Sequence, residues 1–281
     1  MSSALADAET VANARNRSRT AARVWSATWP RLGAIGLAIL AWQIVVWTGW
    51  RPPYVVPPPD EVFSRLFADV RTSEFYLAVF TTLRRAAVGF GVALLVGTLL
   101  GVVVSRSRLL RTAIGSLISG LQSMPSVVWF PLAILLFNIS ESAILFVVIL
   151  GAAPSIANGV ISGVDHVPPL ILRAARMLGA RGPFLYRRVL LPAALPSYLA
   201  GLKQGWAFAW RSLMAGELLV IIGSQSSLGV RLQFAREFSD AAGLVASMIV
   251  VLIVGIAVDS FLFGPLERGV RERRGLVDAA A

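Results

Sequence analysis

The stretch Ser142–Val164 has the sequence SAILFVVILGAAPSIANGVISGV and contains no charged residue in 23 positions. Crossing the hydrocarbon core of a bilayer, about 30 Å thick, takes about 20 predominantly apolar residues in an α-helix. A helix is needed because lipid offers no hydrogen-bond partner to exposed backbone groups. The stretch therefore predicts a membrane-spanning helix and an all-α fold around it.

Five further runs meet the same length criterion: Leu32–Trp50, Ala86–Ser105, Thr112–Ile139, Pro196–Ile222 and Ala241–Gly264. Pro125 and Pro131 interrupt the third of these runs, which indicates either a plain kink or a broken helix that exposes backbone to a cavity. The sequence thus predicts an all-α membrane protein with six transmembrane helices in one domain, residues 32–264.

Composition supports a membrane protein and argues against other classes. Of 281 residues, 56% are hydrophobic and 15% are charged, against about 25% charged in soluble domains. The net charge of +11 would suggest nucleic acid in a soluble protein, but here basic cytoplasmic loops account for it. We therefore expect a lipid bilayer and no nucleic acid as partner. With no Cys and only His166, we expect no metal site and no catalytic cluster of a membrane enzyme.

The distribution of Lys and Arg predicts the orientation in the membrane. The N-tail, the 105–111 loop, the 164–195 loop and the C-tail hold 17 of these residues, and the opposite connections hold 5. The first set is therefore predicted to be cytoplasmic, with a partly disordered N-terminal tail at 1–31 and a C-terminal tail at 265–281. The outer segment 51–85 is predicted to carry a short amphipathic helix that starts at Pro59-Asp60-Glu61, because Pro suits the first helical position and acidic residues suit the first turn.

The cytoplasmic connection 164–195 predicts two short helices separated by a glycine. Pro168-Pro169 precedes Leu170–Leu178, and Gly179 follows as a stop in the left-handed region. Pro183 then begins a second short helix. Small and apolar residues on the first helix could contact a partner, whereas three arginines remain for water or an acidic surface: Arg173, Arg176 and Arg181.

This connection resembles the cytoplasmic loop of bacterial ABC importer permeases, the binding-protein-dependent transport inner-membrane components. Their pattern is Glu-Ala-Ala, three residues, Gly, nine residues, Ile, one residue and Leu-Pro. Ala174-Ala175, Gly179, Val189 and Leu191-Pro192 occupy these positions, and Arg173 replaces the glutamate. The Pro-rich outer segment, Met124-Pro125 and the stretch Ala215–Leu218 resemble the sulfonate/nitrate/taurine subgroup most.

The resemblance implies a type I importer permease fold in the bacterial cytoplasmic membrane, with both termini cytoplasmic. It implies a second permease subunit, in this subgroup usually as a homodimer, two cytoplasmic ABC ATPase subunits and an extracytoplasmic solute-binding protein. ATP and magnesium would bind the ATPase, and no cofactor would bind this chain, which is not itself an enzyme. The residues implied to couple this chain to the ATPase are Arg173, Ala174, Ala175, Gly179, Ala180, Leu191 and Pro192. The sequence agrees with ATP binding to a separate subunit. A phosphate-binding loop needs Gly directly before Lys, and the only lysine, Lys203, follows Leu202.

Polar groups within the predicted spans suggest a translocation path, because a charge there costs about 2.5–3.5 kcal/mol on insertion scales and usually faces a partner or a pore. Arg211 lies deep, where it could attract an anion or pair with Glu217 of another span or subunit. The candidate path residues are Gln122, Ser123, Met124, Ser126, Trp206, Trp210, Arg211 and Glu217.

The predicted function is uptake of a small solute, an anion such as an aliphatic sulfonate, taurine or nitrate. The alternative is a secondary transporter without an ATPase, which would usually show an internal repeat. An adjacent ATPase gene would discriminate between the two.

Reporter fusions test the predicted topology. Fusions after Asp69 and Ser227 are expected to report the outside, and those after Arg108, Arg181 and Arg273 the inside, because of the basic asymmetry. An inside signal after Ser227 would contradict the arrangement of six spans.

Overall fold

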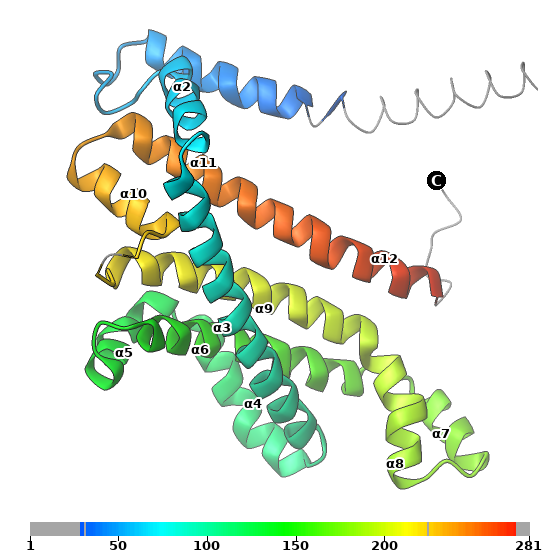
Figure 1. Ribbon diagram of the computed structural model, residues 1–281. Helices are drawn as coiled ribbons and strands as arrows, with labels where there is room; N and C mark the ends of the chain where they lie inside the picture. Colours follow the sequence, from blue (N-terminus) through cyan, green and yellow to red (C-terminus); the bar gives the residue numbers. More distant parts are fainter. Residues whose placement is uncertain (1–28, 31, 224, 274–281) are drawn as a thin grey trace, which may run out of the picture. The chain divides into compact units, whose positions relative to one another are not determined.

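All regular elements are helices in the part of the chain that the computed structural model describes, residues 29–30, 32–223 and 225–273 (Figure 1). The chain divides into two units, residues 1–65 and 66–281. Of the predicted N-terminal tail, only Trp29 and Pro30 lie within the described residues, and positions 274–281 of the C-terminal tail lie outside them.

The first unit contains the helix Leu32–Trp47, which is apolar but shorter than the predicted span. Gly49, with φ +64°, follows its end. The indole nitrogen of Trp42 donates to the carbonyl of Pro57 at 3.1 Å. Helix α2, Pro59–Val70, begins at the proline that the sequence predicted, and Asp60 and Glu61 lie in its first turn, where acids favour the positive end of the helix dipole.

Helix α3, Ser73–Ser105, is 33 residues long and starts well before the apolar run that begins at Ala86. Thr72 caps it, since the side chain accepts a hydrogen bond from the backbone nitrogen of Phe75. Arg84 and Arg85 interrupt the hydropathy pattern but not the helix, because arginine is a good helix former. Both guanidinium groups have acidic partners.

The Pro-interrupted run forms a broken helix rather than a plain kink. Helix α4, Arg108–Ser123, is followed by a short 3-10 helix, Ser126–Trp129, and by α5, Phe130–Phe137. The two parts are bent by 101°. Met124 has φ −79° and ψ 131°, the extended conformation that a following proline imposes, so the chain leaves the helix at Pro125.

The remaining helices follow in order. They are α6 (Glu141–Asp165), α7 (Pro169–Met177), α8 (Gly182–Leu185), α9 (Leu191–Leu219), α10 (Leu228–Glu237), α11 (Ala241–Val258) and α12 (Gly264–Arg273). Helix α6 agrees with the predicted span within one residue at each end. A π-helical turn, Asp259–Phe263, joins α11 to α12, so helical structure runs past the predicted span end at Gly264.

Three described helices are long and apolar enough to cross a membrane: Ser73–Ser105, Glu141–Asp165 and Ala241–Val270. The broken pair could form a fourth span. The count of six spans and the cytoplasmic termini stay predictions.

Small residues allow α3, α6 and α9 to pack closely (Figure 1). Gly159 of α6 faces Gly201 of α9, and a Cβ built on Gly159 would lie 2.7 Å from the Gly201 Cα. Helix α3 contributes Gly97 and Gly101, which lie against the backbone of Ala153 and Ala157. Helix association in lipid depends on such van der Waals contact, since lipid tails are as apolar as the side chains.

Two glycines of α3 provide a matched test of this packing. A Cβ on Gly97 would meet the Ala153 carbonyl oxygen at 2.6 Å, whereas Gly91 has no such neighbour within 4 Å. We expect Gly97→Ala to destabilise the purified protein by about 1–3 kcal/mol, as overpacking does. Gly91→Ala should leave stability unchanged or raise it by up to about 1 kcal/mol through helix propensity. Thermal unfolding in detergent measures both, and equal effects would contradict the packing.

Candidate functional site

The glycine-containing segment between α6 and α9 is held by a complete helix C-cap. Gly179 has φ +86°, a conformation that L side chains rarely adopt. Its N–H donates to the Arg176 carbonyl at 3.0 Å, and the N–H of Ala180 donates to the Ala175 carbonyl at 3.0 Å. This pair of bonds is the Schellman motif, so the glycine ends α7 as the sequence predicted.

The segment has a small apolar core of its own. Val167, Ala180, Leu185 and Leu190 are buried, and Ala175 packs against them. Val164, near the end of α6, and Ala193, in the first turn of α9, pack against the same cluster. The segment is therefore attached to both long helices rather than hanging free.

The outer surface of the segment is apolar and basic. Met177 and Leu178 are 87% and 89% exposed, and Leu170 and Phe184 are exposed as well. Most of the predicted coupling residues share this exposure: Arg173, Ala174, Gly179, Leu191 and Pro192 are exposed, whereas Ala180 is buried and Ala175 is half-buried. A surface of this kind, with large apolar side chains beside arginines, is typical of a protein-binding site.

The break at Pro125 lies against Arg211 of α9. Together they line a cavity of about 350 Å³, which also brings together four other predicted path residues: Gln122, Ser123, Met124 and Ser126. Residues that lie almost 90 positions apart in the sequence thus share one site. The amide nitrogen of Gln122 donates to the Ser155 hydroxyl at 3.1 Å, which ties the end of α4 to α6.

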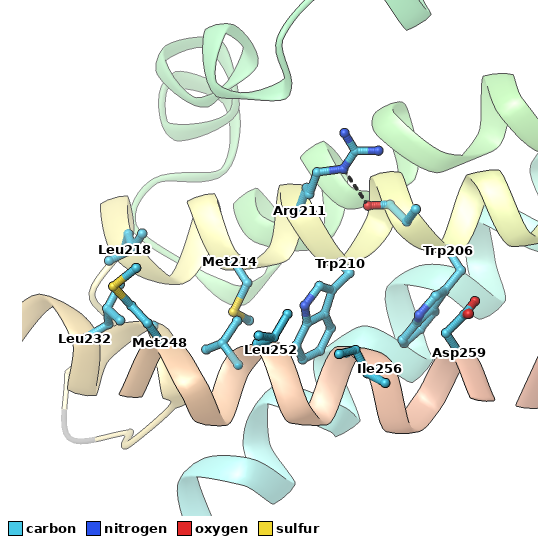
Figure 2. Close-up of a pocket in the computed structure, with 14 residues that line it drawn as sticks. Trp206, Trp210, Arg211, Met214, Leu218, Leu232, Met248, Leu252, Ile256 and Asp259 are labelled. Carbon is cyan, nitrogen blue, oxygen red and sulfur yellow. Dashed lines mark hydrogen bonds between the residues drawn. The ribbon is translucent and has the colours of Figure 1, made fainter. Parts of the chain in front are cut away.

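A second hollow, of about 620 Å³, lies along α9, α10 and α11 and is mostly apolar (Figure 2). Trp206 and Trp210 line it and stack with ring centroids 6.1 Å apart. Arg211 borders this hollow too, but Figure 2 shows its guanidinium turned away from Trp210 and from α11. Its Nε donates to the Ala207 carbonyl at 3.0 Å.

Glu217 lies outside the lining of both hollows, in a buried ionic cluster. Its side chain is fully buried, and Arg85, 2% exposed, donates to it at 3.0 Å. Thr82 donates to the same carboxylate, and the Gly229 N–H donates to it at 3.0 Å. Within this chain, Glu217 is therefore paired with Arg85 of α3 and not with Arg211.

The cluster extends to two further partners of Arg85. Its guanidinium donates to Glu141 at 3.3 Å and to Gln225 at 2.8 Å. It therefore joins α3, α6, α9 and the connection that leads into α10. Lys203, by contrast, lies 3.7 Å from Asp259 and 3.5 Å from Glu267.

Sequence reasoning missed Arg85 and Thr82. One signal was available in the sequence. Arg85 precedes one apolar run and Glu217 lies near the end of another, and each charge needs a partner of opposite sign in lipid. No pattern showed which charges pair, because Arg85 and Glu217 are 132 positions apart. Among the described residues, no group of three or more His, Cys, Asp or Glu side chains could hold a metal ion.

An all-helical membrane chain with an exposed helix–glycine–helix segment and a polar break beside an arginine has the organisation of a transport permease. The chain belongs to the family of binding-protein-dependent transport system inner membrane components, whose model matches residues 93–272. It is 30% identical to a probable ABC transporter permease of Brucella melitensis over 239 residues, 83% of this chain and 95% of the relative.

Other relatives bear out the predicted subgroup. The taurine transport system permease TauC of Escherichia coli K12 is 28% identical and covers 85% of both chains. The nitrate import permease NrtB of Synechocystis is 27% identical over 82% of this chain and 84% of the relative. A solved inward facing structure of the MetNI methionine ABC transporter shares the fold, with a TM-score of 0.59, 22% identity and coverage of 70% of this chain and 96% of that one. The protein is therefore a multi-pass ABC permease of the bacterial cytoplasmic membrane.

The ionic cluster can be tested with adjacent arginines. Arg85→Met would leave Glu217 buried without its positive partner, a loss that typically costs about 3–5 kcal/mol. Arg84 is half-exposed and contacts Glu141 at 2.6 Å, so Arg84→Met should cost at most about 1 kcal/mol, as surface pairs do. Thermal unfolding of the detergent-purified protein compares them, and equal losses would argue against an anchoring role for Arg85.

Proposed function

We propose that this chain is a pore-forming subunit of an ATP-driven importer. It pairs with a second permease subunit, as a homodimer, binds two cytoplasmic ABC ATPase subunits and receives its solute from an extracytoplasmic binding protein. ATP and magnesium bind the ATPase subunits, and this chain performs no hydrolysis. The observation that carries the proposal is the capped α7–Gly179–α8 segment with its exposed apolar and basic surface.

The attachment of this segment supports a role in coupling. The cluster that contains Leu185 and Leu190 also contacts the end of α6 and the start of α9. A push on α7 would therefore reach both long helices without an intervening flexible connection. Helix α9 carries Arg211, so a movement delivered at its first turn acts on the helix that borders the proposed path.

The proposed solute is a small anion, such as an aliphatic sulfonate, taurine or nitrate. Support comes from the names of relatives, which include permeases for taurine, aliphatic sulfonates and nitrate. A deep arginine in α9 agrees with an anionic solute, because ionisable residues within membrane segments usually mark a path or a binding site.

Two substitutions on the segment test the coupling role. Gly179→Val forces a β-branched residue into the left-handed region at a cost of about 1–2 kcal/mol, and Leu178→Ser removes an exposed apolar contact while leaving the cap in place. Both variants are expected to insert normally but to bind the co-expressed ATPase less or to hydrolyse ATP without uptake. Co-purification and uptake in whole cells measure the two effects.

Gly269→Val is the control, since Gly269 on α12 also has open space around it but no positive φ. It should bind ATPase and transport normally. Wild-type ATPase binding and uptake in both Gly179→Val and Leu178→Ser would refute the coupling role.

A further inference from the structure

We infer that the cavity at the broken α4–α5 helix is an oxyanion-binding site within the translocation path, with Arg211 as its charged group. The inference rests on the proposed function and adds to it the place in the chain where the anion binds. The ligand would be a sulfonate or a similar small oxyanion, bound by the guanidinium and by polar groups of the break.

The first argument is the charge of the cavity lining. Of the twelve described residues that line it, Arg211 is the one that ionises, and no carboxylate is among them. Arg85 of α3 and Lys203 of α9, two other basic residues within long helices, have acidic partners in this chain. A membrane-embedded charge needs compensation, so the uncompensated positive charge at this cavity favours an anion.

The second argument is the geometry of the guanidinium. Nε of Arg211 is engaged by the Ala207 carbonyl, and the Phe208 ring lies 4.8 Å from the guanidinium carbon. Among the described residues no hydrogen bond engages either terminal nitrogen. These two nitrogens form the fork that binds planar or tetrahedral oxyanions through paired hydrogen bonds.

Further polar groups lie around the same cavity. Ser126 follows the break and lines the cavity with a hydroxyl that has no hydrogen-bond partner among the described residues. Ser212 is fully buried, and its hydroxyl is also unsatisfied in the described structure. That oxygen lies against the cavity wall at Gly151, where an added Cβ would be 2.6 Å from it. Buried hydroxyls without partners are uncommon, but Ser212 is not itself part of the cavity lining, so Ser126 is the hydroxyl available to a bound oxyanion.

The cavity volume of about 350 Å³ is in the range of small-molecule sites, about 300–1,000 Å³. Discontinuous helices supply substrate sites in other membrane transporters because the break frees polar groups at membrane depth. The apolar lining at Leu150, Phe208 and Trp129 suits an aliphatic tail attached to the oxyanion.

Site-resolved chemical modification tests the inference on the full-length chain in phosphatidylcholine nanodiscs. Phenylglyoxal modifies accessible arginines, and peptide mass spectrometry gives the rate at each one. Ethanesulfonate is expected to slow modification of Arg211 severalfold, and nitrate should act similarly. The neutral isostere ethyl methyl sulfone should have no effect. Arg236, which is exposed on α10 away from the cavity, is the internal control and should react at the same rate throughout.

Variants separate binding from structure. Ser126→Ala should weaken the protection of Arg211 by ethanesulfonate while leaving the yield of purified protein unchanged, since its hydroxyl holds no other group. In cells, Arg211→Gln should lower sulfonate uptake much more than it lowers the amount of assembled complex, and Arg211→Lys should restore part of that uptake.

Three results would overturn the inference: no protection by ethanesulfonate or nitrate, equal protection by the neutral sulfone, or protection by phosphatidylglycerol in the nanodisc with no further effect of ethanesulfonate. The last result would assign the arginine to a lipid head group. If cells take up sulfonate but ethanesulfonate does not protect Arg211, the oxyanion site is rejected and the proposed function is kept. If ethanesulfonate protects Arg211 but the chain binds no ATPase, the proposed function is rejected and the oxyanion site is kept.

Discussion

Gly159 of α6 and Gly201 of α9 lie so close that a Cβ built on Gly201 would be 2.6 Å from the Gly159 Cα. In a bilayer, where the hydrophobic effect does not drive helices together, van der Waals packing at close contacts of this kind helps to hold them together. Helix α6 leads into the α7–α8 segment, and α9 leaves it and carries Arg211. The glycine contact therefore fixes the two helices that connect the proposed ATPase-binding surface to the proposed path.

Two arginines within helices differ in how their charge is compensated. Arg85 is almost fully buried and donates to Glu217, Glu141 and Gln225, so its charge is compensated and it holds helices together. Arg211 is exposed toward a cavity without a carboxylate in its described lining. The same desolvation cost is met by an internal ion pair at Arg85, and by an external anion at Arg211 in the proposed oxyanion site.

Sequence reasoning predicted α6 closely, the stop at Gly179 and a disturbance at Pro125, because each depends on residues a few positions apart. It placed the start of the α3 span at Ala86, whereas the helix begins at Ser73. The apolar run is interrupted by Arg84 and Arg85, whose charges are paired with acidic residues in the folded chain. It also did not predict α10, Leu228–Glu237, which is not apolar enough to stand out from its connection. The sequence suggested each candidate path residue separately and did not predict which of them line the same cavity.

The sequence by itself determined that the protein is helical, belongs in a membrane and carries a helix–glycine–helix segment. These properties follow from transfer free energies summed along the chain and from the local preferences of Pro and Gly. Only the tertiary structure decided that Glu217 pairs with Arg85, 132 positions away, and that Arg211 meets the broken helix at Gln122 and Ser126. Such pairings depend on how α3, α4 and α9 cross: a local spacing of small residues marks a helix face that can pack closely, but it does not show which helix lies against that face.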